Sequence, residues 1–220
     1  MGRMMMKRAW PVWGMGLFLL LTGCQTAYFS AMEKIGYHKR DILVSRVEEA
    51  RTSQQEAKEQ FKTALQKFTE LTGFKGGSLE DKYQKLNSEY ENSKARAEAV
   101  RNRIAAVEDV AEALFAEWKN EIGQYGNAGL RQSSQRKYDE TRQHYSRLIA
   151  AMKKAESKIP PVLTAFNDQV LYLKHNLNAQ AIAALRDELA TVETDIGALI
   201  RDMESSIREA DSFLSAMARE

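Results

Sequence analysis

The sequence is poor in the residues that cross-link a fold or hold a metal. Its 220 residues include one cysteine, three prolines and three histidines. A single cysteine excludes an intramolecular disulfide, so an oxidising compartment would add no covalent cross-link. The histidines His38, His144 and His175 are too few for the paired Glu-x-x-His motifs of a di-iron helical bundle.

Motifs of catalysis and nucleotide binding are also missing. The sequence has no His-Glu-x-x-His zinc motif, no phosphate-binding glycine loop before a lysine and no Gly-x-Ser-x-Gly nucleophile elbow. The glycines of residues 73–77 do not follow a predicted strand, which argues against a nucleotide site. We therefore expect no catalytic residue, no metal, no cofactor and no small-molecule substrate. A cell-wall-associated enzyme is the least favoured function.

The first residues have the layout of a secretory signal peptide. Residues 1–8 carry three basic side chains and no acidic one, and an apolar segment follows from Trp10 to Leu21. This segment is shorter than the roughly 20 apolar residues that a membrane-spanning helix needs. We predict a cleaved leader over residues 1–23.

The leader ends in a short motif that predicts a lipid anchor. Leu21, Thr22, Gly23 and Cys24 resemble the bacterial lipobox, in which a peptidase cuts before an acylated cysteine. Each methylene of the lipid chains on Cys24 would contribute about 0.8 kcal/mol to membrane attachment. Gln25, where enterobacterial inner-membrane lipoproteins have Asp, favours the outer membrane over the inner one, with the chain facing the periplasm. An ordinary buried cysteine is the alternative.

Loss of the leader removes the excess of positive charge. The leader holds three basic residues and no acidic one, so the formal net charge falls from +2 to −1. Nucleic-acid binding requires a basic surface, and we expect no such partner. The remaining chain divides into the lipidated Cys24 with a membrane-proximal segment over residues 24–42, and a helical domain over residues 43–220.

Apolar residues of the helical domain recur at alternating spacings of four and three, the pattern of helices that pack along a left-handed seam. The first seam has one polar member, Gln54, and consists of Leu43, Val47, Ala50, Gln54, Ala57, Phe61, Ala64, Phe68 and Leu71. Further seams follow to Met217. We predict an all-α fold, an elongated antiparallel helical bundle or coiled coil of four to five helices.

The clearest predicted unit is a hairpin of two antiparallel helices. The first helix ends at Gly73, and glycines follow up to Gly77. Ser78 has the character of an N-cap for a second helix that continues to Trp118. The short connection forces the two helices to run antiparallel.

Three places further along are predicted to disturb the helices. Glycines at 123, 126 and 129 break the chain, and Pro160 with Pro161 must kink or interrupt the third helix. The seam changes phase over residues 174–180, where the helix either breaks or stutters. Residues 131–158 carry eight basic and three acidic side chains, whereas residues 183–220 carry four and nine. This complementarity predicts that the two segments lie side by side.

Two polar clusters are candidate contact sites. Tyr37, His38, Lys39 and Arg40 lie close to the predicted lipid and either contact anionic head groups or form a solvated helix start. Lys174, His175, Asn176 and Asn178 interrupt the seam. They either fix register and cap helices or bind a partner, and metal binding or catalysis is the least favoured alternative. The seam tyrosines are expected to be core residues: Tyr83, Tyr90, Tyr138 and Tyr145.

Three stretches resemble a known family. Residues 34–44, 113–118 and 168–179 are similar to the domain-of-unknown-function family 2959 of proteobacteria, and the last stretch, Asp168 to Ala179, is the most specific. The resemblance covers nearly all of the chain after the leader. It implies a helical envelope protein and supplies no activity and no site.

The resulting hypothesis is a non-enzymatic scaffold or adaptor. A permanent anchor, an elongated body and the lack of a catalytic set favour a protein that binds another envelope protein or associates with itself. A chaperone-like binder of exported clients is the alternative, and it predicts exposed apolar seam surface.

Overall fold

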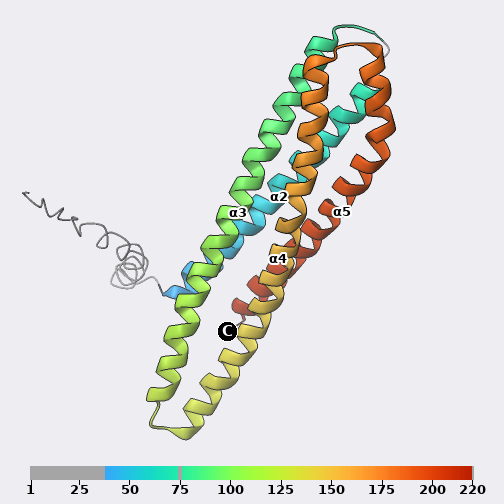
Figure 1. Cartoon of the computed structure of the whole chain (residues 1–220). Coiled ribbons are helices and arrows are strands. Elements are labelled where there is room, and N and C mark those ends of the chain that lie inside the picture. Colours follow the sequence, from blue (N-terminus) through green and yellow to red (C-terminus); the bar gives the residue numbers. More distant parts are fainter. Residues whose placement is uncertain (1–37, 74–75, 220) are drawn as a thin grey trace, which may run out of the picture. The chain divides into compact units, whose positions relative to one another are not determined.

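A computed structural model describes residues 38–73 and 76–219, and this part of the chain is all helical. Four long helices follow one another: α2 (Lys39–Thr72), α3 (Leu79–Gln124), α4 (Ala128–His175) and α5 (Ala179–Met217). They pack as a bundle (Figure 1). None of these helices is both long enough and apolar enough to cross a membrane. The fold class predicted from the seams is confirmed.

Helices α2 and α3 form the predicted antiparallel hairpin. Arg103 of α3 lies 2.5 Å from Glu49 of α2, and Arg96 pairs with Glu56 one heptad further on. Residue numbers rise along α2 where they fall along α3, so the two helices run antiparallel. The seam residues of α2 are buried, and Leu43, Val47 and Phe61 are fully enclosed.

Helix α5 runs antiparallel to both α2 and α4. Asp211 lies 2.5 Å from Arg51 of α2, and Glu204 lies 3.8 Å from Lys58 of the same helix. Asp202 lies 2.7 Å from Lys154 of α4. Acidic α5 is thus paired with basic side chains on two helices, which confirms that the oppositely charged segments lie side by side.

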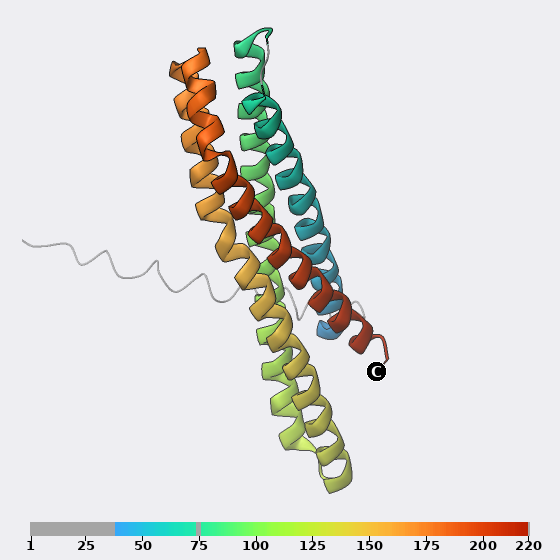
Figure 2. The same ribbon diagram turned by 90° about the vertical axis from the view of Figure 1, so that its right-hand side faces the viewer.

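The helices differ in length, and this divides the bundle into two sections. Arg40 at the start of α2 donates a 2.6 Å hydrogen bond to the carbonyl of Met217 at the end of α5. Beyond this level only α3 and α4 continue (Figures 1 and 2). We name residues 112–124 of α3 and 128–141 of α4 the two-helix extension, and the remainder the four-helix section. At 1.5 Å per residue the extension projects by about 18 Å.

Side-chain caps define three of the four helix starts. The Ser78 hydroxyl accepts from the amide of Asp81, as predicted. The Asn127 side chain accepts from the amide of Leu130, and that of Asn178 accepts from Ala181. Each cap satisfies an amide that has no partner within its helix.

The structure corrects one expected break, confirms a second over a shorter stretch and settles a third. Helix α4 continues through Pro160 and Pro161, both on its exposed side, so the expected interruption is wrong. Gly123 and Gly129 lie inside helices, and the chain reverses only over residues 125–127. At residues 174–180 the helix does break, because α4 ends at His175 and α5 begins at Ala179.

Candidate functional site

The described residues contain no cluster of three or more His, Cys, Asp or Glu side chains that could hold a metal ion. His144 is engaged at its Nδ1 by the guanidinium of Arg147, 2.9 Å away. His38 and His175 are exposed. Within residues 38–73 and 76–219, none of the three histidines belongs to a cluster that could hold a metal ion.

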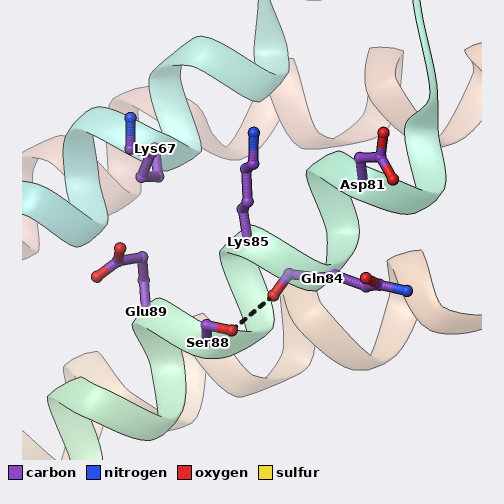
Figure 3. A pocket seen from close by; sticks show the side chains of 6 residues that line it. All are labelled: Lys67, Asp81, Gln84, Lys85, Ser88 and Glu89. Atoms are coloured by element: carbon purple, nitrogen blue, oxygen red, sulfur yellow. Dashed lines mark hydrogen bonds between the residues drawn. The ribbon is translucent and has the colours of Figure 1, made fainter.

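A polar groove lies between α2 and α3 near their connection (Figure 3). It has a volume of about 520 Å³ and is lined by Lys67, Asp81, Gln84, Lys85, Ser88 and Glu89. Lys67 pairs with Glu70 at 3.0 Å, and the hydrogen bond from Lys67 lowers the pKa of that carboxyl. Ser88 donates to the carbonyl of Gln84 at 3.0 Å. The groove is thus a polar surface between two helices, and the side chains of Lys67, Ser88 and Glu89 are bonded to neighbouring residues.

The turn between α4 and α5 is fixed by two of the predicted polar residues. The backbone N–H of Asn176 donates to the carbonyl of Leu173 at 3.1 Å, and the side-chain Nδ2 of Asn176 donates to the carbonyl of Tyr172 at 2.9 Å. Asn178 caps α5 through Ala181 at 3.0 Å. The prediction that this cluster caps helices is confirmed for both asparagines.

Apolar side chains are exposed around the same turn. Leu171, Tyr172 and Leu177 are 47%, 41% and 37% exposed, and Lys174 and His175 are exposed beside them. We name this cluster the α4–α5 end. The seam pattern pointed to Lys174 and His175 but missed the three apolar residues. Leu171 and Tyr172 lie off the seam next to a helix break, which was the available signal. Leu177 continues the seam spacing in the sequence but is exposed, because α4 ends before it at His175.

The opposite end of α4 has a second exposed apolar pair. Tyr125 and Leu130 are 38% and 58% exposed. The guanidinium of Arg131 donates to the Tyr125 carbonyl from Nη2 at 2.6 Å and from Nε at 3.2 Å. Together with the Asn127 cap, these bonds hold the reversal rigid. We name it the α3–α4 end, and the sequence pattern did not identify it.

Exposed large apolar side chains are confined to these two ends. Within residues 38–73 and 76–219, the five that are exposed are Tyr125, Leu130, Leu171, Tyr172 and Leu177. The sides of the bundle present charged and polar residues instead, such as Arg101 and Glu91. Contiguous exposed apolar groups mark contact sites on soluble proteins, so the two ends of α4 are the candidate contact surfaces.

An aromatic cluster stabilises the two-helix extension. Phe115 of α3 packs edge to face on Tyr138 of α4, with ring centroids 5.6 Å apart. Trp118 packs on Tyr138 at 5.7 Å and donates its indole N–H to Ser134 at 2.9 Å. Arg142 lies over the Phe115 ring at 5.9 Å. These contacts confirm that Tyr138 is a packing residue.

Tyr145 continues this cluster towards the four-helix section. Its ring lies 5.4 Å from that of Phe115. Burial, and then the nearby carboxylates of Glu108 and Glu112, raise the pKa of Tyr145 to about 12. The phenol is therefore neutral, and its half-buried ring packs at the edge of the core. Of the four seam tyrosines expected in the core only Tyr138 is buried, whereas Tyr83, Tyr90 and Tyr145 are half-buried, so the expectation is wrong for these three.

The predicted membrane-proximal residues are only partly within the described chain. His38 is exposed, while Lys39 and Arg40 are half-buried at the start of α2. Arg40 contacts the carbonyl of Met217, which is a bond between helices. Tyr37, Cys24 and the lipobox lie outside the described residues, so the lipid anchor and the head-group contact stay predictions.

Comparison with known proteins identifies a family. The model of a protein of unknown function, DUF2959, matches residues 28–217. No curated protein and no solved structure matches the chain. The match includes all four helices and both ends of α4, and the chain belongs to the DUF2959 family.

Proposed function

We propose that this chain is a lipid-anchored, non-enzymatic scaffold or adaptor of the bacterial envelope that binds another envelope protein at its α4–α5 end. The observation that carries the proposal is the exposure of Leu171, Tyr172 and Leu177 around a rigid turn. No other apolar group of this size is exposed on the four-helix section, as far as its residues are described.

The chemistry of the α4–α5 end suits a protein partner. Interface cores are enriched in aromatic and aliphatic side chains, and polar residues surround them. Tyr172 and the two leucines supply such a core, and Lys174 and His175 supply a basic rim. A basic rim favours a partner with an acidic surface. The turn is already ordered by Asn176 and Asn178, so little conformational entropy is lost when a partner binds.

The buried seams favour an adaptor over a chaperone-like protein. A binder of unfolded clients would need its apolar seam exposed to them. The seam residues of α2 and α5 are instead buried, among them Phe61, Leu185 and Leu199, each with no exposed surface. The bundle would have to unfold before these residues could reach a client.

Photo-crosslinking in the living bacterium tests the partner. A crosslinking amino acid in place of Lys174 should yield a discrete adduct with one acidic envelope protein. The same amino acid in place of Arg101, exposed on the side of α3, is the matched control. The adduct should disappear when Leu171 and Tyr172 are both changed to Ser. Adducts to a second copy of the chain alone, or equal adducts at both positions, would contradict the adaptor proposal.

Fractionation tests the anchor. Replacement of residues 1–24 by a secretory leader that is cleaved without acylation should move the protein from the membrane fraction to the soluble fraction, because the lipid is the main source of attachment. Wild type should sediment with outer-membrane markers and resist a salt wash. Salt-resistant membrane association of the variant with the exchanged leader would contradict the lipid anchor.

A further inference from the structure

We propose that the α3–α4 end is a second membrane contact, which rests on the bilayer that holds the lipid of Cys24. This inference depends on the proposed anchor and adds a second point of attachment to it. The occupant is the surface of a bilayer that contains anionic glycerophospholipids.

The first argument is the composition of the exposed surface. Leu130 is 58% exposed at the outermost reversal of the chain, and Tyr125 is 38% exposed beside it. Tyrosine and leucine at the edge of a basic surface are the residues that enter the head-group region of a membrane. A rigid turn places both side chains at the tip without any ordering step.

The second argument is charge. Between residues 118 and 138 the chain carries Lys119, Arg131, Arg136 and Lys137, but only one acidic side chain, Glu121. All four basic residues are exposed. Glu117, which is half-buried, lies about as far from the turn along its helix as Arg136 does, so residues 117–138 keep an excess of two basic side chains. A basic tip is attracted to anionic lipid, and each basic residue near the surface contributes roughly 1 kcal/mol.

The third argument is reach. The α3–α4 end projects beyond the start of α2, so the first residues of α2 and the tip of the extension belong to the same end of the bundle. The extension is about 18 Å long. Residues 24–38 could span up to about 50 Å if fully extended. The linker is thus long enough for the lipid and the tip to meet the same bilayer.

This geometry separates the two ends of α4. A helix of 48 residues is about 72 Å long. With the α3–α4 end on the membrane, α4 becomes a strut that presents the α4–α5 end to partners far from the bilayer surface. The aromatic cluster of the extension gives the strut its stiffness near the membrane.

Spin labelling of the reconstituted lipoprotein tests the contact. The mature protein has no unmodified cysteine, so Leu130→Cys and Leu177→Cys each introduce a single labelling site at opposite ends. Each labelled full-length lipoprotein is placed in phosphatidylcholine vesicles with and without phosphatidylglycerol. Collisions of the nitroxide with oxygen report the membrane, and collisions with a water-soluble nickel complex report water.

In phosphatidylglycerol vesicles the label at position 130 should be oxygen-accessible and shielded from nickel, whereas the label at 177 should remain in water. Reversing two charges with Arg136→Glu and Lys137→Glu should reduce the membrane-contacting fraction by about an order of magnitude or more. Arg101→Glu with Lys94→Glu, on the side of α3, is the matched control and should change little.

The outcomes separate the inference from the anchor. Protein that floats with the vesicles but leaves position 130 in water overturns the membrane contact and leaves the anchor intact. Shielding of position 130 only at high protein density indicates a second copy of the chain and also overturns it. Protein that does not float contradicts the lipid anchor, and the membrane contact with it.

Discussion

The four-helix section and the two-helix extension are stabilised by different kinds of side chain. In the four-helix section the core consists of aliphatic, small and phenyl groups, and Leu43, Phe61 and Leu199 have no exposed surface. In the extension the large buried side chains all retain some contact with water, such as Tyr138 at 6%, Phe115 at 7% and Ile122 at 8%. Two helices cannot surround a side chain as four can.

The extension compensates with aromatic rings that have polar edges. Tyr138 accepts a 2.6 Å hydrogen bond from Arg142, and the Trp118 indole donates to Ser134. Rings of this kind bury a large area and tolerate water at one edge. The comparison indicates that the helix pair that projects from the bundle relies on rings with polar edges, whereas the four-helix section relies on fully enclosed apolar side chains. It also predicts that the two sections respond differently to mutation.

The largest effect is expected in the four-helix core. Phe61→Ala removes a fully buried ring and should lower the free energy of unfolding of the whole domain by about 3 to 5 kcal/mol. Denaturant unfolding followed by circular dichroism measures this. Lys62→Ala, at the exposed neighbouring position, is the control. A loss below about 1 kcal/mol for Phe61→Ala would show that this core is not what holds the bundle.

The next largest effect is local to the extension. Phe115→Ala removes the ring that contacts both Tyr138 and Tyr145 and should cost about 3 kcal/mol, near the low end for a buried ring. Hydrogen exchange should show lost protection in residues 112–141 only. Equal loss of protection in α2 and α5 would mean that the two sections unfold as one unit, against the comparison.

A smaller and opposite effect is expected at Gln54. Its side chain is fully buried, and neither its Oε1 nor its Nε2 has a hydrogen-bond partner among the described residues. Arg51 pairs with Asp211 and Lys58 pairs with Glu204. Gln54 of α2 and Ser206 of α5 lie between these two ion pairs, at a similar height in the bundle. Gln54→Leu removes the desolvation cost and should stabilise the domain by about 1 to 2 kcal/mol. Destabilisation in the same unfolding assay would indicate that the amide is satisfied by internal water or by Ser206.

The smallest effect concerns pH. Because burial raises the pKa of Tyr145 from its ordinary value of 10.0 to about 12 in the folded chain, the folded state holds this proton more tightly than the unfolded state. Its contribution to stability is complete below pH 10 and is lost as the pH rises to about 12. Tyr145→Phe should flatten the alkaline decline of the melting temperature. If the melting temperature of Tyr145→Phe fell with rising pH as steeply as that of the wild type, other titrating groups would be responsible for the decline.

Much of the fold was predictable because the seams repeat over many heptads. Ser78 and the glycines after Thr72 correctly located the first hairpin, and the phase change at residues 174–180 correctly located a helix break. Pro160 and Pro161 were misleading. They lie on the exposed side of α4 between the buried Ile159 and Val162, and packing of these neighbours keeps the helix continuous.

The candidate site was less predictable, because the spacing of apolar residues predicts which positions are buried and does not predict which apolar residues are exposed. Leu171 and Tyr172 lie next to the seam residues Val170 and Leu173, and their exposure depends on which face of α4 the other helices cover. Leu130 similarly looks like an ordinary helix residue until α3 and α4 are seen to continue alone. Tertiary arrangement, more than periodicity, decides which apolar residues reach the surface.

Hydroxyl-radical footprinting is the most direct test of the claim that the two ends of α4 are the contact surfaces. The lipoprotein is oxidised in native outer-membrane vesicles and, separately, after purification in detergent. We predict that Tyr125, Leu130, Leu171, Tyr172 and Leu177 are protected in the vesicles, while the half-buried Tyr83 on the side of α3 is oxidised equally in both. Protection of Tyr83 with no protection at either end would contradict the account.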